Sequence, residues 1–529
     1  MTMNAAWTLL QAGAPQATAL ECGNEILSYE ALRQRVRLAA GAWREMGLHR
    51  GDRVIVIGPD SIDWVLAYLG VIWAGGVAIG VNPRLALSEL APILSESKVR
   101  FVWCEADDVV PLSQLLATLK PAPTLVNGGL AASDWTRRMV CAREVDAVLR
   151  EEQAPALWIG TSGTTGVSKG VVHAQRVALQ PDSFARGVLN LSAADRLYAS
   201  SKLFFAYALG NSLFAGLRAG ATVVLDRQWP DPGRVLEMVR QHRPSLVFCV
   251  PTLYSKMLQS GVAAQLRDCG IRSFVSAGES LPPSVRKAWR EATGLAIVSG
   301  YGTSETLCLM LYSQDDSGLL QATPQTEVSF AAGAEPTLPQ RIWLRSSSVA
   351  LGYWKRPQAQ ADGFDDGWYS PGDMFLRRAD GLLEFAGRTD DMLKISGRWV
   401  STLWVEQAMA SAAGDSVVQL ACVGVQTPEG LTALSLLAVA APQQQSVAAQ
   451  RIQTGIDALP TYRRPNWVHW VDALPLTATG KLQRSRLIAI HEAALAAQLP
   501  RYLPLMASNS TSNSSVAFGG MTPPAPRSP

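Results

Sequence analysis

The stretch LWIGTSGTTGVSKGV, residues 157–171, carries the pattern that decides the fold. Its first three residues form an apolar run typical of a buried strand, and a segment rich in Gly, Ser and Thr follows and ends at Lys169. Glycines let backbone N–H groups turn toward an anion, hydroxyl groups add hydrogen-bond donors, and a lysine adds positive charge. The stretch therefore predicts a strand followed by a phosphate-binding loop.

This loop differs from the Walker A loop that binds phosphates in many nucleotide hydrolases. Counting from Gly163, Ser168 takes the place of the second glycine, and Gly170 rather than Ser or Thr follows Lys169. An ordinary turn rich in Ser and Gly is the alternative interpretation. The length of the run and its position directly after a strand favour phosphate binding.

Apolar runs of strand length alternate with helical patterns on both sides of this loop. Helices are expected over residues 61–73 and over residues 232–242, a segment that starts with Pro232 and ends before Pro244. The alternation indicates an α/β fold with layered, largely buried sheets. The strand-like runs are residues 53–57, 77–81, 157–159, 222–225, 246–250, 274–276 and 297–299.

Length and composition limit the class of protein. A chain of 529 residues is too long for one compact core, so more than one domain is expected. A formal net charge of +3 gives no reason to expect a nucleic acid or a membrane surface as a partner. The most apolar window, residues 64–81, contains Gly70, Gly75 and Gly76 and is interpreted as a buried helix leading into a buried strand rather than as a membrane span.

The cysteines and the N-terminus indicate a reducing compartment. The 7 cysteines form no Cys-x-x-Cys pair and, with 5 scattered histidines, show no zinc-ligand spacing. The start MTMNAAWTLL lacks the basic and apolar regions of a signal peptide. A cytoplasmic protein is therefore expected, and both a monomer and a homodimer are compatible with the sequence.

Further motifs follow the loop in order, namely GYGTSE at residues 300–305, YSPGD at 369–373, GRTDDMLKISG at 387–397 and PLTATGK at 475–481. In these motifs the chain resembles the adenylate-forming superfamily of acyl- and aryl-CoA synthetases, luciferase-like enzymes and peptide-synthetase adenylation domains. The resemblance covers about residues 20–490. Any one motif alone would be weak evidence, but their common order makes chance an implausible explanation.

The resemblance implies a large N-terminal AMP-binding domain of several subdomains over residues 1–389 and a small, mobile α+β C-terminal domain over residues 390–505. Asp390 would be the hinge about which the small domain rotates after adenylation, and Gly397 would then line the thiol tunnel. Residues 506–529 are rich in Ser, Asn and Pro and are expected to form a disordered tail.

The resemblance also implies a two-step reaction. A carboxylate attacks the α-phosphate of ATP to give an acyl-adenylate and pyrophosphate, and a thiol then displaces AMP. Ser304 would contact the α-phosphate, Glu305 would hold Mg²⁺, and the catalytic Lys481 would approach the attacking carboxylate and the α-phosphate. The loop residues expected around the pyrophosphate group are Thr161, Ser162, Gly163, Thr164, Thr165, Gly166 and Lys169.

The adenosine part of ATP is expected between short motifs of the large domain. Tyr301 would lie against the adenine ring, and Asp373 would accept hydrogen bonds from the ribose hydroxyls, because one carboxylate can accept from both. The residues that match nucleotide-binding positions of the family are Gly278, Glu279, Tyr301, Gly302, Thr303, Asp373 and Arg388.

Residues 201–212, SKLFFAYALGNS, are similar to the corresponding motif of benzoate-, hydroxybenzoate- and anthranilate-CoA ligases. Aromatic residues beside small ones suit a flat pocket for one ring, and packing of the same aromatics in the core is the alternative interpretation. The residues that match ring-lining positions are Ala206, Tyr207, Gly278, Leu307, Cys308 and Leu309.

Departures from the family pattern concern turnover and specificity more than fold. Cys308 stands where several aryl-CoA ligases have His, and a thiol is a poorer hydrogen-bond partner, so the ring substituents of the acid are not predicted. Ser168 replaces the proline that usually precedes the loop lysine, and residues 314–341 form a shorter segment than the family pattern.

The main hypothesis is an AMP-forming aryl-CoA ligase that uses ATP, Mg²⁺ and coenzyme A to activate benzoate or a hydroxy- or aminobenzoate. One alternative is a stand-alone aryl-adenylating enzyme that loads the phosphopantetheine thiol of a carrier protein. Another is a catalytically weak homologue that acts as a binding protein. The presence of Lys169, Glu305, Asp373, Arg388 and Lys481 argues against the weak homologue.

Overall fold

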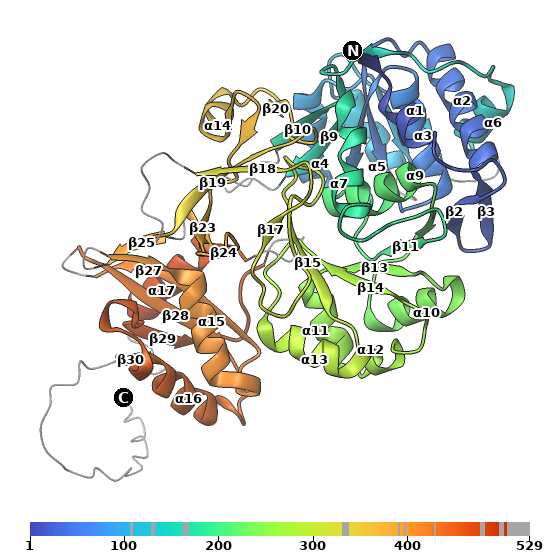
Figure 1. Cartoon of the computed structure of the whole chain (residues 1–529). Coiled ribbons are helices and arrows are strands. Elements are labelled where there is room, and N and C mark those ends of the chain that lie inside the picture. Colours follow the sequence, from blue (N-terminus) through green and yellow to red (C-terminus); the bar gives the residue numbers. More distant parts are fainter. Residues whose placement is uncertain are drawn as a thin grey trace, which may run out of the picture. The chain divides into compact units, whose positions relative to one another are not determined.

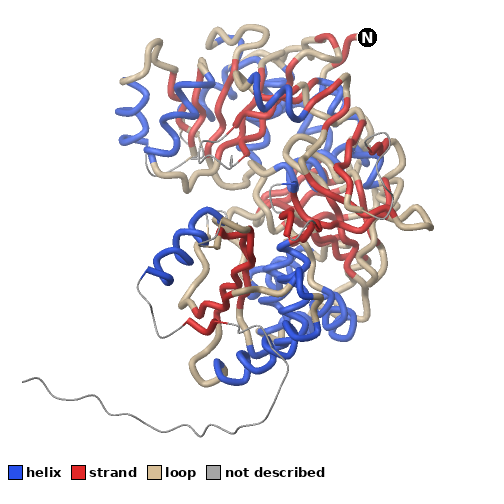
Figure 2. The backbone as a smooth tube through the Cα atoms, turned by 90° about the vertical axis from the view of Figure 1, so that its left-hand side faces the viewer, coloured by secondary structure: helices blue, strands red, loops and turns tan. Residues whose placement is uncertain are grey.

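The computed structural model describes residues 1–105, 109–128, 133–161, 169–330, 338–389, 392–395, 398–427, 430–476, 482–496 and 502–504. The chain divides into two compact units, Met1–Asp390 and Asp391–Pro529. Both units combine helices with sheets (Figures 1 and 2). The α/β fold class expected from the alternation of strand and helix patterns is confirmed.

A seven-stranded sheet of the large unit contains the strands on both sides of the Gly-rich loop. Its central strands are largely apolar because both faces are covered: in β4, Val54 and Val56 lie in one core cluster, Ile55 and Ile57 in another. The strands, in spatial order, are β20 (Gly352–Tyr353), β10 (Lys169–Ala174), β9 (Pro155–Thr161), β5 (Val77–Val81), β4 (Arg53–Ile57), β6 (Phe101–Cys104) and β7 (Thr124–Asn127).

A nine-stranded sheet carries the GYGTSE motif at the end of one of its strands. The strands from β15 to β2 in the order below run parallel to their neighbours, and antiparallel strands close both edges. The order is β17 (Gln321–Ala322), β16 (Leu311–Ser313), β15 (Ile297–Tyr301), β14 (Ser273–Ser276), β13 (Leu246–Cys249), β11 (Arg196–Ala199), β12 (Thr222–Leu225), β2 (Thr18–Cys22) and β3 (Glu25–Ser28).

Helices α1 (Ala5–Leu9), α2 (Tyr29–Glu45) and α3 (Ile62–Trp73) share one hydrophobic core with strands of both sheets, including Leu20 of β2 and Val54 of β4. Helices α4 (Leu87–Ser97) and α5 (Val109–Ala117) cover the opposite face of the seven-stranded sheet. The large unit therefore consists of layers of helices and sheets. Helix α6 (Asp134–Cys141) packs against α2, and its Trp135 belongs to the same core as α1, α2 and α3.

The nine-stranded sheet is likewise covered on both faces. Helices α10 to α13 pack together on one face, as Figure 1 shows, and share a core with β13 and β14. The other face packs on α7 and α9. The elements are η1 (Gln175–Leu179), α7 (Pro181–Ala185), α8 (Ala206–Ala208), the π-helical turn η2 (Leu209–Phe214), α9 (Ala215–Ala219), α10 (Pro232–His242), α11 (Pro251–Gln259), α12 (Val262–Gln265) and α13 (Pro283–Thr293).

A third, smaller sheet completes the large unit and contains the YSPGD motif between two of its strands. Its core includes Ile342, Leu344 and Phe375. The strands are β21 (Phe364–Asp365), β22 (Trp368–Tyr369), β19 (Gln340–Arg345), β23 (Asp373–Arg377) and β24 (Leu383–Arg388), with β18 (Glu327–Phe330) paired to β19; α14 (Pro357–Gly363) and the pair β1 (Thr2–Met3) and β8 (Arg150–Glu151) complete the unit.

The small unit has its own core around a four-stranded sheet. Val405 and Met409 of one helix and Ile452 and Ile456 of another pack on Leu436 of the sheet. Its elements are β25 (Met392–Ile395), β26 (Arg398–Ser401), α15 (Thr402–Ala413), η4 (Gly414–Ser416), β27 (Gln419–Gln426), β28 (Thr432–Val439), α16 (Gln445–Ala458), η5 (Thr461–Arg463), β29 (Trp467–Trp470), α17 (Arg484–Ala496) and β30 (Tyr502–Pro504).

The expected helix leading into a strand over residues 64–81 is confirmed as α3 followed by β5. Ser61 caps α3, because its Oγ accepts a 3.1 Å hydrogen bond from the N–H of Trp64. The strand predicted over residues 246–250 ends one residue earlier, because Val250 is the N-cap of α11, whose first residue is Pro251. Within the described ranges, no helix combines the length and the hydropathy needed to cross a bilayer.

Candidate active site

The two ends of the Gly-rich loop lie opposite each other on two adjacent antiparallel strands. Thr161, the last residue of β9, pairs with Lys169, the first residue of β10, and Gly160 pairs with Gly170. The loop thus starts and ends at the same edge of the sheet. The predicted phosphate-loop residues between these ends lie outside the described residues; they are Ser162, Gly163, Thr164, Thr165 and Gly166, together with Ser168.

Lys169, predicted beside the pyrophosphate group, and Glu305, predicted to hold Mg²⁺, contact the same tyrosine. The Nζ atom of Lys169 lies 5.4 Å from the ring centroid of Tyr353, which is within the range of a cation–π contact. The Tyr353 hydroxyl donates a 2.7 Å hydrogen bond to Oε1 of Glu305. Burial and the adjacent Glu305 carboxylate raise the pKa of Tyr353, so the phenol stays protonated and remains a donor.

Backbone pairing within the seven-stranded sheet places Tyr353 beside Lys169 and Glu305. Tyr353 pairs with Val171 in the antiparallel ladder between β20 and β10, and Trp354 N–H donates to the carbonyl of Gly170 at 2.8 Å. The Tyr353 N–H donates in turn to Oε1 of Gln360 on α14 at 2.9 Å. Tyr353 is absent from the predicted site, because 48 residues separate it from Glu305 and no motif marks it.

Tyr301 and Asp373, both predicted at the nucleoside, form a direct hydrogen bond. The Tyr301 hydroxyl at the end of β15 donates to Oδ2 of Asp373 at the start of β23. Asp373 pairs with Arg388 across β23 and β24, and Arg388 Nε lies 3.7 Å from Oδ1 of Asp373. The Tyr301 ring stands edge-to-face on Phe375, with centroids 5.3 Å apart. The structure therefore brings these three predicted residues together.

The GYGTSE motif forms a tight, hydrogen-bonded turn after β15. A Cβ at Gly302 would lie 2.8 Å from the carbonyl oxygen of Cys308, so this close approach requires glycine. The N–H of Thr303 donates to Oγ1 of Thr306 at 2.9 Å, and the N–H of Glu305 donates to Oγ1 of Thr303 at 3.2 Å. These contacts fix the direction of the Glu305 side chain, which is 7% exposed.

The carbonyl oxygen of Ser304 is held by a buried histidine that the sequence did not single out. His173 Nε2 lies 2.8 Å from this oxygen. Because a carbonyl only accepts, Nε2 must carry the proton. Burial lowers the pKa of His173 to about 4, so the imidazole is neutral at physiological pH and donates from Nε2. His173 belongs to β10, four residues after Lys169, and thus ties the GYGTSE turn to the strand that follows the loop.

Gly278 and Glu279 follow β14, beside the strand that ends in Tyr301. Gly278 has a φ of +91°, a conformation that favours glycine. Glu279 is exposed, and its Oε2 accepts a 2.9 Å hydrogen bond from Oγ1 of Thr252. Both residues therefore leave the nine-stranded sheet at its carboxyl edge, the edge at which ligands bind in parallel sheets.

The two segments predicted to line a ring are joined by Asn211. Its Nδ2 donates to the carbonyls of Tyr207 at 3.1 Å and Leu307 at 3.4 Å, and its Oδ1 accepts from the N–H of Leu309 at 3.0 Å. Leu307 has a φ of +53°, which a leucine adopts only when its surroundings hold it. The structure thus places residues 206–207 and 307–309 side by side.

The side chains of these segments differ in exposure. Ala206 and Tyr207 are partly exposed, whereas Leu307, Cys308 and Leu309 are buried. The Tyr207 hydroxyl donates to the carbonyl of Val275 at 2.9 Å. Burial raises the pKa of the Cys308 thiol, so it stays neutral.

Glu305 has the donor chemistry that a magnesium ion requires. Mg²⁺ is usually held by one or two carboxylates together with phosphate oxygens and waters. In the part of the chain that the structure describes, no group of three or more His, Cys, Asp or Glu side chains could hold a metal ion. One buried carboxylate therefore fits the share of Mg²⁺ ligands that a protein usually supplies when phosphate oxygens and waters supply the rest.

The predicted residues of the small unit lie mainly outside the described residues. This holds for the predicted hinge Asp390, for Gly397 and for the predicted catalytic Lys481. Glu406 of α15 is described: its Oε1 accepts from the N–H of Cys422 at 2.8 Å and from Arg484 at 3.0 Å. Arg484, which opens α17, lies shortly after Lys481 in the sequence. The Glu406–Arg484 pair therefore anchors the start of α17 to the sheet of this unit.

Comparison with known proteins adds independent evidence. The chain matches the family model described as AMP-binding enzyme over residues 10–354. It is 37% identical over 501 residues to a 3-hydroxybenzoate-CoA ligase of Aromatoleum sp. (strain CIB), covering 90% of this chain and 94% of that protein. It is 34% identical to a 3-hydroxybenzoate-CoA/4-hydroxybenzoate-CoA ligase of Thauera aromatica, covering 92% and 96%. A benzoate CoA ligase structure from Burkholderia xenovorans LB400 is 28% identical with a TM-score of 0.82, covering 92% of this chain and 100% of that one.

Proposed function

Because the chain belongs to the AMP-binding enzyme family, we propose that it is an AMP-forming aryl-CoA ligase. It activates an aromatic carboxylic acid of the benzoate, hydroxybenzoate or aminobenzoate type with ATP, and it transfers the aryl group from an aryl-adenylate to the thiol of coenzyme A. The observation that carries the proposal is the meeting of Lys169 and Glu305 on Tyr353, because it gathers a cation and a carboxylate at the end of a Gly-rich loop.

In the first step the carboxylate of the acid attacks the α-phosphorus, and the bond to the pyrophosphate oxygen breaks. Negative charge shifts onto the departing pyrophosphate, so groups that stabilise this charge accelerate the step. Lys169, at the end of the loop, supplies a positive charge, and the loop supplies N–H and hydroxyl donors. Glu305 would hold Mg²⁺, which neutralises phosphate charge when bound.

Ser304 is proposed to contact the α-phosphate. The hydrogen bond from His173 to its carbonyl and the Thr303 contacts fix the backbone of this turn before substrate binds. Such preorganisation avoids reorientation during the reaction.

The nucleoside is proposed to bind where Tyr301 and Asp373 meet. The Tyr301 hydroxyl and Arg388 orient the Asp373 carboxylate, whose side chain is 10% exposed and can accept hydrogen bonds from ribose hydroxyls. The Tyr301 ring, supported by Phe375, offers a face to adenine. Gly278 and Glu279, at the carboxyl edge of the neighbouring strand, are proposed to form the other side of the adenine site.

The small unit is proposed to serve both steps. Lys481 would approach the attacking carboxylate and the α-phosphate in the first step, and rotation about Asp390 would then replace it with the loop around Gly397, which lines the thiol path. The division of the chain at Asp390 and Asp391 supports this proposal. We propose that the protein works in the cytoplasm, where ATP and coenzyme A are available.

The experiment that tests the function is a panel of acids. The purified protein is mixed with ATP, Mg²⁺ and benzoate, 3-hydroxybenzoate, 4-hydroxybenzoate, 2-aminobenzoate or butyrate, and AMP release is measured with and without coenzyme A. We expect AMP release that depends on an aromatic acid and equals the amount of aryl-CoA formed. Acid-independent AMP release, or activity with butyrate alone, would contradict the proposal. Turnover with a carrier-protein thiol but not with coenzyme A would assign a different acceptor.

A further inference from the structure

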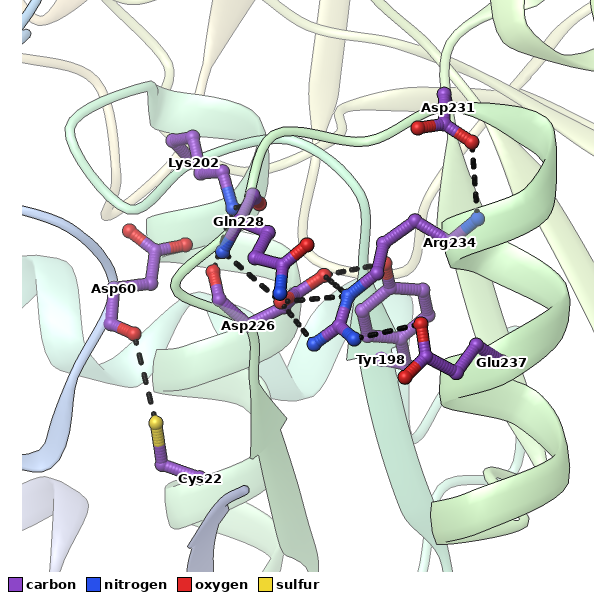
Figure 3. A network of polar contacts seen from close by, with 9 residues as sticks. All are labelled: Cys22, Asp60, Tyr198, Lys202, Asp226, Gln228, Asp231, Arg234 and Glu237. Carbon is purple, nitrogen blue, oxygen red and sulfur yellow. Dashed lines mark hydrogen bonds and ion pairs between the residues drawn. The ribbon is translucent and has the colours of Figure 1, made fainter.

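The segment that leads into the proposed ring-binding residues contains a buried lysine. Lys202 is 4% exposed. Its ammonium group donates a 2.6 Å hydrogen bond to the backbone carbonyl of Asp226 and a further one to the carbonyl of Gln228 (Figure 3). Burial of an ammonium group costs several kcal/mol unless its donors and its charge are matched. A buried lysine at this place therefore requires partners that are themselves fixed.

The carboxylates that attract the Lys202 ammonium group are Asp60, which is also 4% exposed, and Asp226. Asp60 lies in the turn between β4 and α3, and its Oδ1 accepts a 3.0 Å hydrogen bond from the N–H of Leu203. Burial raises the pKa of Asp60 to about 7, and the positive charge of Lys202 opposes this rise. Asp60 thus holds the segment by the hydrogen bond at Leu203 and attracts the Lys202 ammonium group electrostatically.

The carbonyls that Lys202 meets are held by the start of α10. Arg234 donates from Nη2 to Oδ1 of Asp226 at 2.7 Å and from Nε to both carboxylate oxygens at 3.1 Å. Tyr198 donates from its hydroxyl to Oδ2 of Asp226 at 3.3 Å, and the N–H of Gln228 donates to Oδ1 at 3.1 Å. Figure 3 shows these groups converging on Asp226. Two fixed carbonyls therefore define one position for the Lys202 ammonium.

The segment around Lys202 consequently contacts chain segments from both large sheets, through Lys202 at Asp226 and through Leu203 at Asp60. Asp60 follows β4 of the seven-stranded sheet, and Asp226 follows β12 of the nine-stranded sheet. The backbone of Phe204 also lies against the seven-stranded sheet: a Cβ at Gly80 of β5 would be 3.2 Å from the Phe204 Cα. The segment around Lys202 is thus set by contacts on both sides.

Helix α8 (Ala206–Ala208) is the first turn of a continuous helical run that passes through η2 and α9 to Ala219. Its N-cap is Phe205, whose side chain carries no capping group, so the start of this run lacks a cap of its own. The N–H of Phe205 donates to the carbonyl of Lys202 at 2.9 Å, which closes a turn directly before the helix. The position of Ala206 and Tyr207 therefore depends on where the turn at Lys202 is held, together with the contacts of Tyr207 with Val275 and Asn211.

From these contacts we propose that Lys202 is a positioning residue for the aromatic acid. Together with Asp60 it holds the turn that presents Ala206 and Tyr207, and so it sets the fit of the ring without touching the substrate. This inference rests on the proposed function, because it assumes that residues 206–207 border the acid. ATP binding should be nearly independent of Lys202, because Lys169, Tyr301 and Asp373 are held by other contacts.

The test is Lys202→Met, which keeps much of the side-chain volume and removes the ammonium group. We expect the KM for the aromatic acid in acid-dependent pyrophosphate exchange to rise at least tenfold, while the KM for ATP changes less than twofold. Equal rises of both KM values, or an unchanged KM for the acid, would overturn the proposal.

A second variant separates positioning from stability. Lys202→Met leaves Asp60 without its counter-charge, which lowers stability. In the double variant Lys202→Met/Asp60→Asn no charge is stranded, and the Asn oxygen can still accept from Leu203. We expect the double variant to melt closer to the wild-type temperature but to keep the raised KM for the acid. A wild-type KM in the double variant would assign Lys202 a purely structural role, even if the single variant fails to fold.

The matched control is Arg227→Met in the same loop as Asp226. Arg227 is half exposed and pairs with Glu105. We expect this variant to keep the wild-type KM for the acid, and a rise equal to that of Lys202→Met would overturn the proposal. The inference and the proposed function fail differently. If the wild-type protein shows no acid-dependent pyrophosphate exchange, the proposed function is wrong. If the wild-type protein shows this exchange but Lys202→Met has the wild-type KM for the acid, only the inference is refuted.

Discussion

Tyr353 donates a 2.7 Å hydrogen bond from its hydroxyl to Oε1 of Glu305. The same ring lies against Lys169 at the end of the Gly-rich loop. One aromatic side chain thus links the carboxylate proposed to hold Mg²⁺ with the cation proposed to bind phosphate. The link occurs within a short ladder between β10 and β20, so the backbone fixes it before any substrate is present.

Tyr353→Phe should weaken the use of Mg²⁺. Loss of a hydrogen bond to a charged group costs about 1.5 kcal/mol, which corresponds to about a tenfold change. We expect the Mg²⁺ concentration that gives half-maximal AMP release to rise by about this factor, because Glu305 is less well oriented. Mg²⁺-dependent ATP binding, measured by calorimetry, should weaken in parallel.

Tyr301→Phe is the control for this prediction. It removes the hydroxyl that donates to Asp373 at the proposed nucleoside site. We expect a higher KM for ATP with little change in the Mg²⁺ requirement. Identical effects of the two variants would contradict the separate roles given to Glu305 and Asp373.

Asn211→Ala should impair binding of the acid. It leaves the N–H of Leu309 without its partner and releases Leu307 from the contact that helps to hold its positive φ. An unsatisfied buried group costs about 1–3 kcal/mol. We expect lower thermal stability and about a tenfold higher KM for the acid, measured by pyrophosphate exchange at saturating ATP.

Asn211→Asp tests which contact matters for the acid. The aspartate keeps an acceptor for the N–H of Leu309 but can no longer donate to the carbonyls of Tyr207 and Leu307. If its KM for the acid equals the wild-type value, the bond to Leu307 has no part in positioning the ring.

His173 should make stability depend on pH in the acidic range. Its pKa falls from the ordinary value of 6.5 to about 4 in the folded chain because of burial. Between these values the unfolded chain binds a proton that the folded chain does not, so the free energy of unfolding falls as pH falls from 6.5 toward 4. The contribution is on the order of 3 kcal/mol. Above pH 6.5 both states are neutral and the effect vanishes.

The measurement is urea unfolding of the wild-type chain and of His173→Gln at pH 7 and pH 5. Glutamine can still donate to the Ser304 carbonyl but does not titrate. We expect the wild-type chain to lose more stability between the two pH values than the variant does. Equal losses would show that His173 is not the group responsible.

Lys481→Ala should separate the two half-reactions. We expect it to abolish acid-dependent pyrophosphate exchange, because the positive charge of Lys481 is proposed to assist the attack of the carboxylate on the α-phosphorus. Formation of aryl-CoA from supplied aryl-adenylate should be largely retained, since this step is proposed to use the other arrangement of the small unit. Both half-reactions are measured by quenched-flow assays. Equal loss of both would argue against a two-state scheme.

Much of the fold follows from local signals in the sequence. The strand β4 appears with its predicted bounds because a parallel strand covered on both faces reads as a continuous apolar run. Helix α10 also has its predicted bounds, because Pro232 opens it and Asp231 caps it with a 3.0 Å hydrogen bond from the N–H of Arg234. Strand β10 was not predicted after the loop, since it begins with Lys169 and Gly170 rather than with apolar residues.

The contacts that build the site could not be predicted in the same way. Motifs indicated Glu305, Asp373 and Tyr301, but the hydrogen bonds that orient them join residues far apart in the sequence. His173 is 131 residues from Ser304, and Asn211 is 96 residues from Leu307. Such pairings depend on the order of strands within the sheets and on loop paths, and they leave no periodic pattern in one sequence.

The most direct test of the central claim follows the oxygen atoms of the acid. If the carboxylate attacks the α-phosphorus of ATP, one of its oxygens remains on AMP when the thiol displaces the adenylate. The protein is supplied with benzoate labelled with ¹⁸O in both carboxylate positions, together with ATP, Mg²⁺ and coenzyme A, and the AMP is analysed by mass spectrometry. The account predicts one ¹⁸O atom in each AMP formed. Unlabelled AMP alongside aryl-CoA would contradict an aryl-adenylate intermediate.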